Sequence, residues 1–233
     1  MSGSISRKLV TDGLIFYVDA ANPKSFISGN TTWDDLGGNN NGTLTNGPTF
    51  DLDNGGSIVF DGSDDYIELG SIDSSNPLSL YGQTEFSIDL WLKPNYSGDD
   101  YQRVIDKSNS SSALNGWAIL YPRNTSKFFY LFIDGATVLS YNDSSADGNW
   151  RNFTVTRNGS DTNLYINSEL VTTQTVAATI PIDTTNMRIA TWNHTTGREY
   201  NGKIGNIKIY SKELLSTEVL QNYNALKKRF KLE

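Results

Sequence analysis

The sequence predicts an all-β fold: a two-sheet antiparallel jelly-roll sandwich of the concanavalin A-like type, with one short C-terminal helix. The clearest sign is the run 86–93, in which Phe, Ile and Leu alternate with Ser, Asp, Trp and Lys before a proline. Such alternation is typical of a strand with one face in a core. The chain also contains 20 glycines and 12% aromatic residues, a composition that suits many short strands and tight turns.

Alternating runs of this kind recur along the chain and define the expected strands. Asp-Gly at 61–62 and Asn-Gly at 158–159 supply the residues that tight hairpin turns require. The first strand is expected at 13–19. The others are expected at 57–60, 66–69, 86–93, 102–107, 116–121, 127–134, 137–141, 151–157, 162–167, 187–192 and 203–210.

Two of these strands carry aromatic stripes. Trp117 and Tyr121 share one face of their strand, as do the aromatic residues at 128, 130 and 132. An alternating aromatic stripe usually packs in a core rather than lining a groove. We therefore expect most of these side chains in the core and keep Trp117 and Tyr121 as secondary candidates for ligand contact.

Only one helix is expected, close to the C-terminus. Ser216 can cap its first turn, and Glu218 within that turn complements the helix dipole. The basic run 227–229 at its end also suits the dipole and does not require a nucleic-acid or lipid partner. The apolar stripe of this helix consists of Val219, Tyr223, Leu226 and Phe230.

Length and charge limit the organisation and the possible partners. A chain of 233 residues suits one domain, expected at 9–230, with 1–8 and 231–233 as flexible termini. A net charge of −7 argues against nucleic acid, and no apolar run is long enough for a membrane span or a signal peptide. The absence of cysteine fits folding in a reducing bacterial cytoplasm.

Four segments resemble laminin-G-like domains of the concanavalin A-like lectin/glucanase type. They are 57–69 (SIVFDGSDDYIEL), 85–94 (EFSIDLWLKP), the hairpin 150–167 and the closing strand and helix 202–223. The resemblance spans roughly 9–230. It implies the jelly-roll fold, whereas fold alone does not determine function.

Three segments of the chain are similar to a subtype of this domain found in virion structural proteins of tailed bacteriophages. The similarity lies in 13–26, in 42–48 and in the ending 215–223. It implies a virion-surface or extracellular location, other virion proteins as partners and a possible homo-oligomer.

The sequence predicts that the protein is not an enzyme. Glycanases of this fold need paired carboxylates. Glu85 and Asp89 share a strand face, but the E-x-D-x-x-E pattern of those glycanases is absent. Asp89 is better interpreted as an outward polar residue. His194 is the only histidine and cannot form a His-based zinc site alone.

The loop 192–201 is the leading candidate for a binding site. An exposed aromatic ring would stack on a sugar, while amide and charged side chains would bind its hydroxyls. This predicts a module that binds a polysaccharide or cell-surface glycan. The alternatives are a purely structural virion assembly protein, or a carbohydrate-binding module or glycanase from an extracellular bacterial protein. Exposure of Trp192 would distinguish the first two. The candidate residues are Trp192, Asn193, His194, Arg198, Glu199 and Tyr200.

A structural calcium ion is the only cofactor expected. The polar stretch 20–48 is long for a loop in a compact domain, so it is either functional or held in place. Its Asp, Asn and Gly residues offer the hard oxygen ligands that Ca²⁺ binds. In similar domains a corresponding loop helps hold calcium, and Asp35 and Asn39 match it best, with Asp19 as a neighbour. The alternative is a solvated loop with Asx turns.

Overall fold

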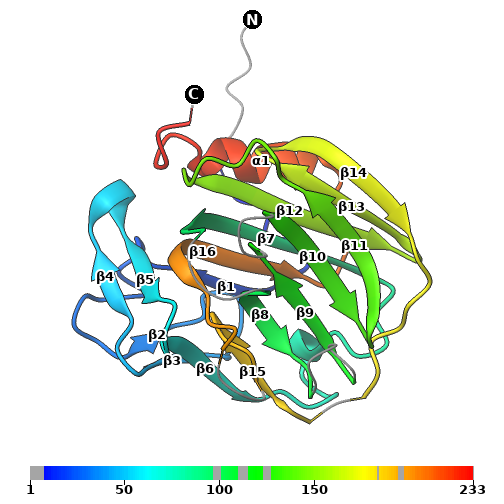
Figure 1. Cartoon of the computed structure of the whole chain (residues 1–233), viewed down its shortest axis with the longest axis horizontal. Helices are drawn as coiled ribbons and strands as arrows, with labels where there is room; N and C mark the ends of the chain where they lie inside the picture. The colour runs from blue at the N-terminus through cyan, green and yellow to red at the C-terminus, as the bar shows by residue number, and fades with distance from the viewer. Residues whose placement is uncertain are drawn as a thin grey trace, which may run out of the picture.

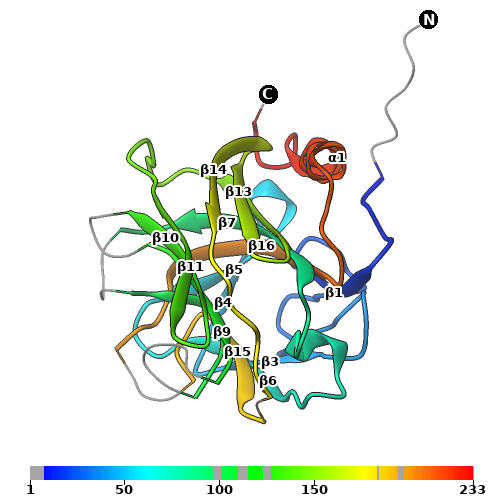
Figure 2. The ribbon, with the colours of Figure 1, turned by 90° about the vertical axis from the view of Figure 1, so that its right-hand side faces the viewer.

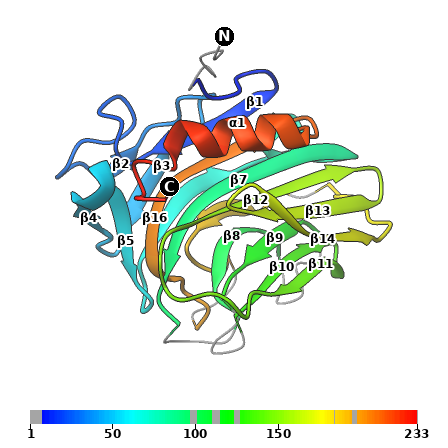
Figure 3. The same ribbon diagram turned by 90° about the horizontal axis from the view of Figure 1, so that it is seen from above.

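The computed structural model describes residues 8–96, 101–109, 115–122, 127–182, 184–193 and 197–232. Two antiparallel sheets of eight strands, sheet A and sheet B, pack against each other (Figure 1). The single α-helix within these ranges, α1 (Ser216–Leu226), lies on the outer side of sheet A (Figure 3). This arrangement confirms the predicted jelly-roll sandwich.

Sheet A contains the two longest strands at its centre, β7 (Glu85–Pro94) and β16 (Asn201–Tyr210). The first half of β16 pairs with β5 (Ser57–Asp61) and its second half pairs with β1 (Leu14–Asp19), so the sheet branches there. The strand order is β14 (Glu169–Thr175), β13 (Asp161–Ile166), β12 (Arg151–Asn158), β7 (Glu85–Pro94), β16 (Asn201–Tyr210), β5 (Ser57–Asp61) and β4 (Thr49–Asp51), with β1 (Leu14–Asp19) beside β16.

Sheet B forms the other layer and carries no α-helix from the described part of the chain. Two 3₁₀ turns, η1 (Asp53–Gly55) and η2 (Pro77–Ser79), lie in connections. The strand order is β11 (Ala136–Asn142), β10 (Phe128–Ile133), β9 (Trp117–Leu120), β8 (Arg103–Lys107), β15 (Asn186–Ile189), β6 (Tyr66–Ser71), β3 (Gly42–Thr45) and β2 (Thr32–Trp33). The strands β2, β3, β4 and β14 were not predicted from the sequence.

The two sheets meet along the side on which β11 and β14 lie (Figure 2). The Gln174 side chain of β14 bonds to the backbone of Ser140 on β11. Its Oε1 accepts the Ser140 N–H at 3.1 Å, and its Nε2 donates to the Ser140 carbonyl at 2.8 Å. One amide side chain thus pairs the exposed backbone of an edge strand, which would otherwise be free to pair with another chain.

The core lies between the sheets and follows the predicted face of β7. Phe86, Ile88, Leu90 and Leu92 are all buried there, while Trp91 lies in a separate cluster on the other side. Both faces of β7 are buried because α1 covers the outer one. The predicted assignment of the two faces is therefore confirmed.

The predicted faces of β10 are wrong. Phe129, Leu131 and Ile133 enter the core, whereas Phe128, Tyr130 and Phe132 lie half-buried on the outer side of sheet B. The strand is apolar on both faces, so alternation alone could not show which set faces inward. The stripe that contains Trp117 and Tyr121 was predicted correctly, because both residues lie in the core.

The helix α1 is held on sheet A by aromatic packing. Tyr223 lies parallel to Trp91 with ring centroids 5.8 Å apart, and the ring of Phe230 lies 4.2 Å from Trp91. Gly205 of β16 makes room for this contact, since a Cβ there would lie 2.6 Å from the Phe230 ring. In the described part of the chain, no helix has the length and apolar character needed to span a membrane.

The helix begins one residue away from the expected position. Ser216 is its first residue, and the capping position is Leu215, which has no side-chain acceptor. Glu218 instead accepts the Leu215 N–H at 2.9 Å. The Glu218 side chain therefore caps the first turn, the role that was predicted for Ser216.

Candidate functional site

The predicted binding loop lies in the sequence between β15 and β16. Trp192 is only 8% exposed. The Arg198 guanidinium lies 4.4 Å from the centroid of its ring, and that of Arg103 lies 6.0 Å away. An indole covered in this way offers no open platform for a sugar, contrary to the expected stacking role.

The other residues of this loop are mostly engaged within the protein. Tyr200 is fully buried in the core, edge-on to Phe60, and burial raises the pKa of its hydroxyl well above the usual value. Glu199 is buried and accepts the Gly197 N–H at 2.8 Å. Arg198 remains half-buried at the surface, and His194 lies outside the described residues. Tyr200 therefore cannot stack on a ligand in this arrangement.

Asn193 is also held by backbone groups. Its side-chain amide donates to the carbonyl oxygens of Ser108 and Asn186. It joins the predicted loop to β15 and to the end of β8. Whether Asn193, Arg198 or Glu199 contacts a ligand stays a prediction.

The secondary candidates Trp117 and Tyr121 are fully buried. The Trp117 indole N–H donates to the Ser79 carbonyl at 3.3 Å, and the Tyr121 hydroxyl donates to Asp143 at 2.9 Å. Burial, and then the Asp143 charge, raise the pKa of the Tyr121 hydroxyl. Both side chains stabilise the core and are not open to a ligand, so this expectation is corrected.

Asp35, which was expected to bind calcium, makes hydrogen bonds within the protein. One Asp35 oxygen accepts the N–H groups of Tyr17 and Gly37 at 2.9 and 2.8 Å, and the other accepts that of Asn40 at 3.1 Å. Asn39 itself is exposed. The bonds from Gly37 and Asn40 shape the loop as an Asx-type turn does, and the bond from Tyr17 ties it to β1.

Asp19 belongs to a different arrangement. Its carboxylate pairs with Arg229 at 2.6 Å and accepts the Tyr17 hydroxyl at 2.9 Å. Arg229 also donates to backbone carbonyls of Asn54 and Gly56, so it fastens the C-terminal segment to the β4–β5 hairpin. The negative charge of Asp19 is thus already balanced by a cation, which weakens its case as a calcium ligand.

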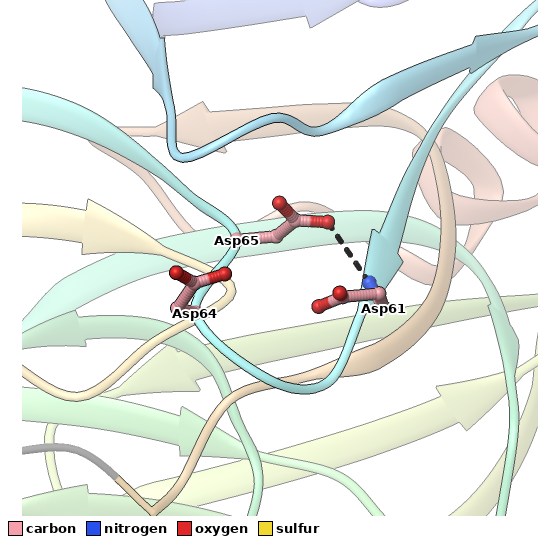
Figure 4. Close-up of side chains that lie close together, drawn as sticks. All are labelled: Asp61, Asp64 and Asp65. Atoms are coloured by element: carbon pink, nitrogen blue, oxygen red, sulfur yellow. Dashed lines mark hydrogen bonds between the residues drawn. The ribbon is translucent and has the colours of Figure 1, made fainter.

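The turn between β5 and β6 contains an acidic group that could hold a cation. Ligand oxygens of Asp61, Asp64 and Asp65 lie within 4.8 Å of one another (Figure 4). The Asp65 carboxylate accepts the Asp61 N–H at 3.0 Å, and Asp61 accepts the Ser63 N–H at 2.8 Å. Burial, together with its two acidic neighbours, raises the pKa of Asp65. These hydrogen bonds stabilise the turn. A bound cation would reduce the electrostatic repulsion among the three carboxylates.

Calcium binding is checked by thermal melts in chelator and in millimolar calcium. A native-state ligand at a hundredfold excess over its Kd adds about 2.7 kcal/mol to the free energy of unfolding. We expect a higher melting temperature with calcium. A shift lost in Asp35→Ala places the ion at the long loop, and one lost in Asp64→Ala places it at the acidic turn. Identical curves for the unmodified protein would contradict the calcium prediction.

The outer side of sheet B carries the most conspicuous group of surface aromatics, which we call the aromatic face: Tyr101, Phe128, Tyr130 and Phe132. Neighbouring ring centroids along β10 lie 5.6 and 5.5 Å apart, and Tyr101 lies 6.4 Å from Tyr130. The rings pack over small and aliphatic residues of β9, Ala118 and Leu120. Alternate residues of a strand share a face, so these three aromatic residues of β10 build one surface.

Charged residues continue this surface across the sheet. The backbone register places Phe132, Ala118, Asp106, Arg188 and Glu68 in one row over β10, β9, β8, β15 and β6. The Arg188–Glu68 pair at 2.8 Å is partly exposed. The row therefore joins an aromatic end to a charged end.

A second ion pair in this region is buried. Arg103 and Asp106 lie 3.4 Å apart beneath Trp192. Burial raises the pKa of Asp106 to about 6, against the opposing effect of Arg103, and lowers the pKa of Arg103 to about 10. Arg198 lies 5.5 Å from the ring of Tyr101, so it links the predicted loop to the aromatic face.

The carboxylate pair considered for catalysis is not arranged around a cleft. Glu85 is exposed, whereas Asp89 is fully buried under the α1 side of sheet A. The Asp89 carboxylate binds Lys208 at 2.8 Å and Thr154 at 3.0 Å. Asp89 does point outward from the sandwich, as predicted, but it is inaccessible to a substrate. The prediction that the protein has no catalytic activity stays a prediction.

Comparison with known proteins identifies the family. The family model described as "Concanavalin A-like lectin/glucanases superfamily" matches residues 61–220. No curated protein is significantly similar in sequence.

Several solved structures share the fold. Domain 4 of AbnA, an extracellular arabinanase of Geobacillus stearothermophilus solved with arabinotriose, has a TM-score of 0.64 at 14% identity and covers 90% of this chain and 98% of its own. The binding domain of botulinum neurotoxin DC, in complex with SialylT, has a TM-score of 0.65 at 19% identity and covers 96% of this chain. This chain spans about half of that toxin domain (52%).

A glycosidase is also among the similar structures. A Trypanosoma rangeli sialidase mutant displaying trans-sialidase activity has a TM-score of 0.67 at 11% identity and covers 97% of this chain. This chain covers only 34% of that enzyme. At such low identities the similarity shows the fold alone.

Proposed function

The chain belongs to the concanavalin A-like lectin/glucanase superfamily, and on that premise we propose that it is a non-catalytic glycan-binding module. Its site is the aromatic face on the outer side of sheet B, bordered by Arg198. One observation carries the proposal. The three aromatic side chains on the outer face of β10 are half-buried and partly accessible, whereas the core is built by the opposite face of the strand.

The geometry suits a carbohydrate because one continuous surface carries aromatic rings at one end and charged groups at the other. Aromatic rings bind the CH surfaces of sugars, and charged or amide groups bind the hydroxyls. The partly exposed Arg188–Glu68 pair supplies a donor and an acceptor in the same row as Phe132. Arg198 supplies a second donor beside Tyr101.

Supporting examples come from proteins of the same fold. An arabinanase domain was solved with arabinotriose, and a neurotoxin binding domain was solved with SialylT. We therefore take an oligosaccharide or polysaccharide as the ligand. A single open face buries little of a hydrated ligand, so we expect weak monovalent binding that becomes useful in many copies.

The proposal is tested by multivalent display of the protein on an array of bacterial polysaccharides. We expect Tyr130→Ala to lower binding on the order of tenfold, the loss expected when one aromatic contact of about 1.4 kcal/mol is removed. Tyr81→Ala is the matched control, because Tyr81 is exposed and lies outside the aromatic face. It should bind like the unmodified protein.

Two outcomes would contradict the proposal. Equal binding by Tyr130→Ala and the unmodified protein would remove the aromatic face from consideration. Failure of every form to bind any glycan would favour a structural assembly role.

We also propose a setting for the module, the surface of a bacteriophage virion. The support is the resemblance of residues 13–26 and 42–48 to virion structural proteins. Mass spectrometry of purified virions that carry the gene tests this. On a virion, its partners would be other virion proteins and further copies of the chain. If the chain is absent from virions, the alternative setting is an extracellular bacterial protein.

A further inference from the structure

Two lysines face each other in the middle of sheet A. Lys93 of β7 and Lys203 of β16 are register partners, and both side chains lie on the outer side of the sheet, where Trp91 also lies. Like charges directly opposite each other in a sheet are destabilising. Because β7 and β16 are central strands, these lysines do not protect an edge, and the unfavourable pairing needs another explanation.

One carboxylate is paired with Lys203 and is influenced more weakly by the charge of Lys93. Asp51 of β4 forms an ion pair with Lys203. The hydrogen bond from Lys203 is the main cause that lowers the pKa of Asp51, and the charge of Lys93 makes a smaller contribution. Within the described ranges, the Lys93 ammonium group has no hydrogen bond or ion pair, whereas the Lys93 backbone pairs with β16.

Two pockets meet at Lys93, and we call them together the Lys93 groove. The first has a volume of about 400 Å³ and includes Tyr96, Gly148 and Asn201; the second, of about 460 Å³, includes Asn149 and Asn167. Both volumes fall within the range of roughly 300–1,000 Å³ typical of small-ligand sites. Amide groups that bind hydroxyls thus flank an ammonium group.

The lining of the groove contains four cationic side chains, Lys93, Lys203, Arg151 and Lys231, and two carboxylates, Asp53 and Asp147. Arg151 is paired with Asp143 at 2.9 Å and Asp147 at 3.9 Å, and Lys203 is paired with Asp51. Among the described residues, Lys93 has no carboxylate within ion-pair distance. An anionic ligand at Lys93 would balance the opposed lysines.

We propose that the Lys93 groove is a second binding site, for an acidic oligosaccharide. Lys93 binds the anionic substituent, a carboxylate or a sulfate, and Asn149 and Asn167 bind neighbouring hydroxyls. The groove is on sheet A, whereas the aromatic face is on sheet B, so the two sites are independent. The class of ligand follows from the combination of an unbalanced ammonium group with flanking amides.

The test is isothermal titration calorimetry of the whole chain with three probes at physiological salt: trigalacturonic acid, its carboxyl-reduced neutral counterpart, and a sulfated oligosaccharide of similar length. The two acidic probes distinguish a carboxylate from a sulfate ligand. We expect at least one of them to bind and the neutral probe not to bind. We expect Lys93→Gln to weaken the acidic probe about tenfold, since a hydrogen bond to a charged group is lost.

Controls separate this site from nonspecific charge and from the aromatic face. Lys24→Gln removes the same charge from an exposed position outside the groove and should bind as before. Tyr130→Ala should also bind as before, whatever the outcome on the polysaccharide array. Thermal melts verify that Lys93→Gln is folded. Equal weakening by Lys93→Gln and Lys24→Gln, binding of the neutral probe, or no binding of either acidic probe would overturn the proposal.

Discussion

Replacing Asp89 by alanine is expected to lower the free energy of unfolding by about 3–5 kcal/mol. Asp89 and Lys208 form a fully buried ion pair at 2.8 Å, and Lys208 also donates to Asn206 at 2.8 Å. The pair lies on the outer side of sheet A between the two apolar clusters that include residues of α1. Without Asp89, the lysine would be a buried charge with no balancing carboxylate. Urea unfolding measures the loss.

Two further variants show whether the buried charge is the cause. Asp89→Leu combined with Lys208→Met removes both charges and should recover most of the loss, because buried pairs can often be replaced by apolar residues of similar volume. Asp12→Ala breaks the surface pair with Lys212 and should cost no more than about 1 kcal/mol, since Asp12 is 83% exposed. If Asp89→Ala were as mild as Asp12→Ala, the pair would not be buried as described.

The second large effect is expected for Phe230→Ala. This ring is buried against Trp91 at 4.2 Å and Trp150 at 4.6 Å, and its removal leaves a cavity between the C-terminal segment and sheet A. Truncation of a buried phenylalanine costs about 3–5 kcal/mol. We expect a loss of this size in the free energy of unfolding, together with a change in tryptophan fluorescence as Trp91 and Trp150 become hydrated.

Leu220→Ala is the matched control for Phe230→Ala. Leu220 lies on α1 but is 47% exposed, so its truncation should change stability far less. A similar loss in both variants would mean that the helix as a whole, rather than the Phe230 contact, determines the stability of this layer.

The fold was predictable because the strands that build it alternate clearly. In β7 the apolar positions 86, 88, 90 and 92 all reach the core, as the pattern required. The short strands β2 and β4 were missed because two or three residues cannot show a period. Their positions depend on pairing with β3 and β5 instead.

The candidate site was harder to predict, because exposure depends on contacts between distant parts of the chain. Trp192 is covered partly by Arg103 of β8, a contact that local sequence cannot reveal. The residues of the aromatic face were missed because β10 is apolar on both sides, so period and composition were equally consistent with either orientation. The neighbouring strand β9 did carry a signal for the orientation. Its core face has the large Trp117, whereas its outer face has the small Ala118, over which the β10 rings pack.

Intermolecular nuclear Overhauser effects show whether the aromatic face binds a sugar. The measurement uses the full chain with an oligosaccharide that the polysaccharide array selects. We expect contacts from sugar CH protons to the ring protons of Phe128, Tyr130 and Phe132. Contacts confined to other rings, such as Tyr81 or Tyr96, with none to these three, would contradict this expectation.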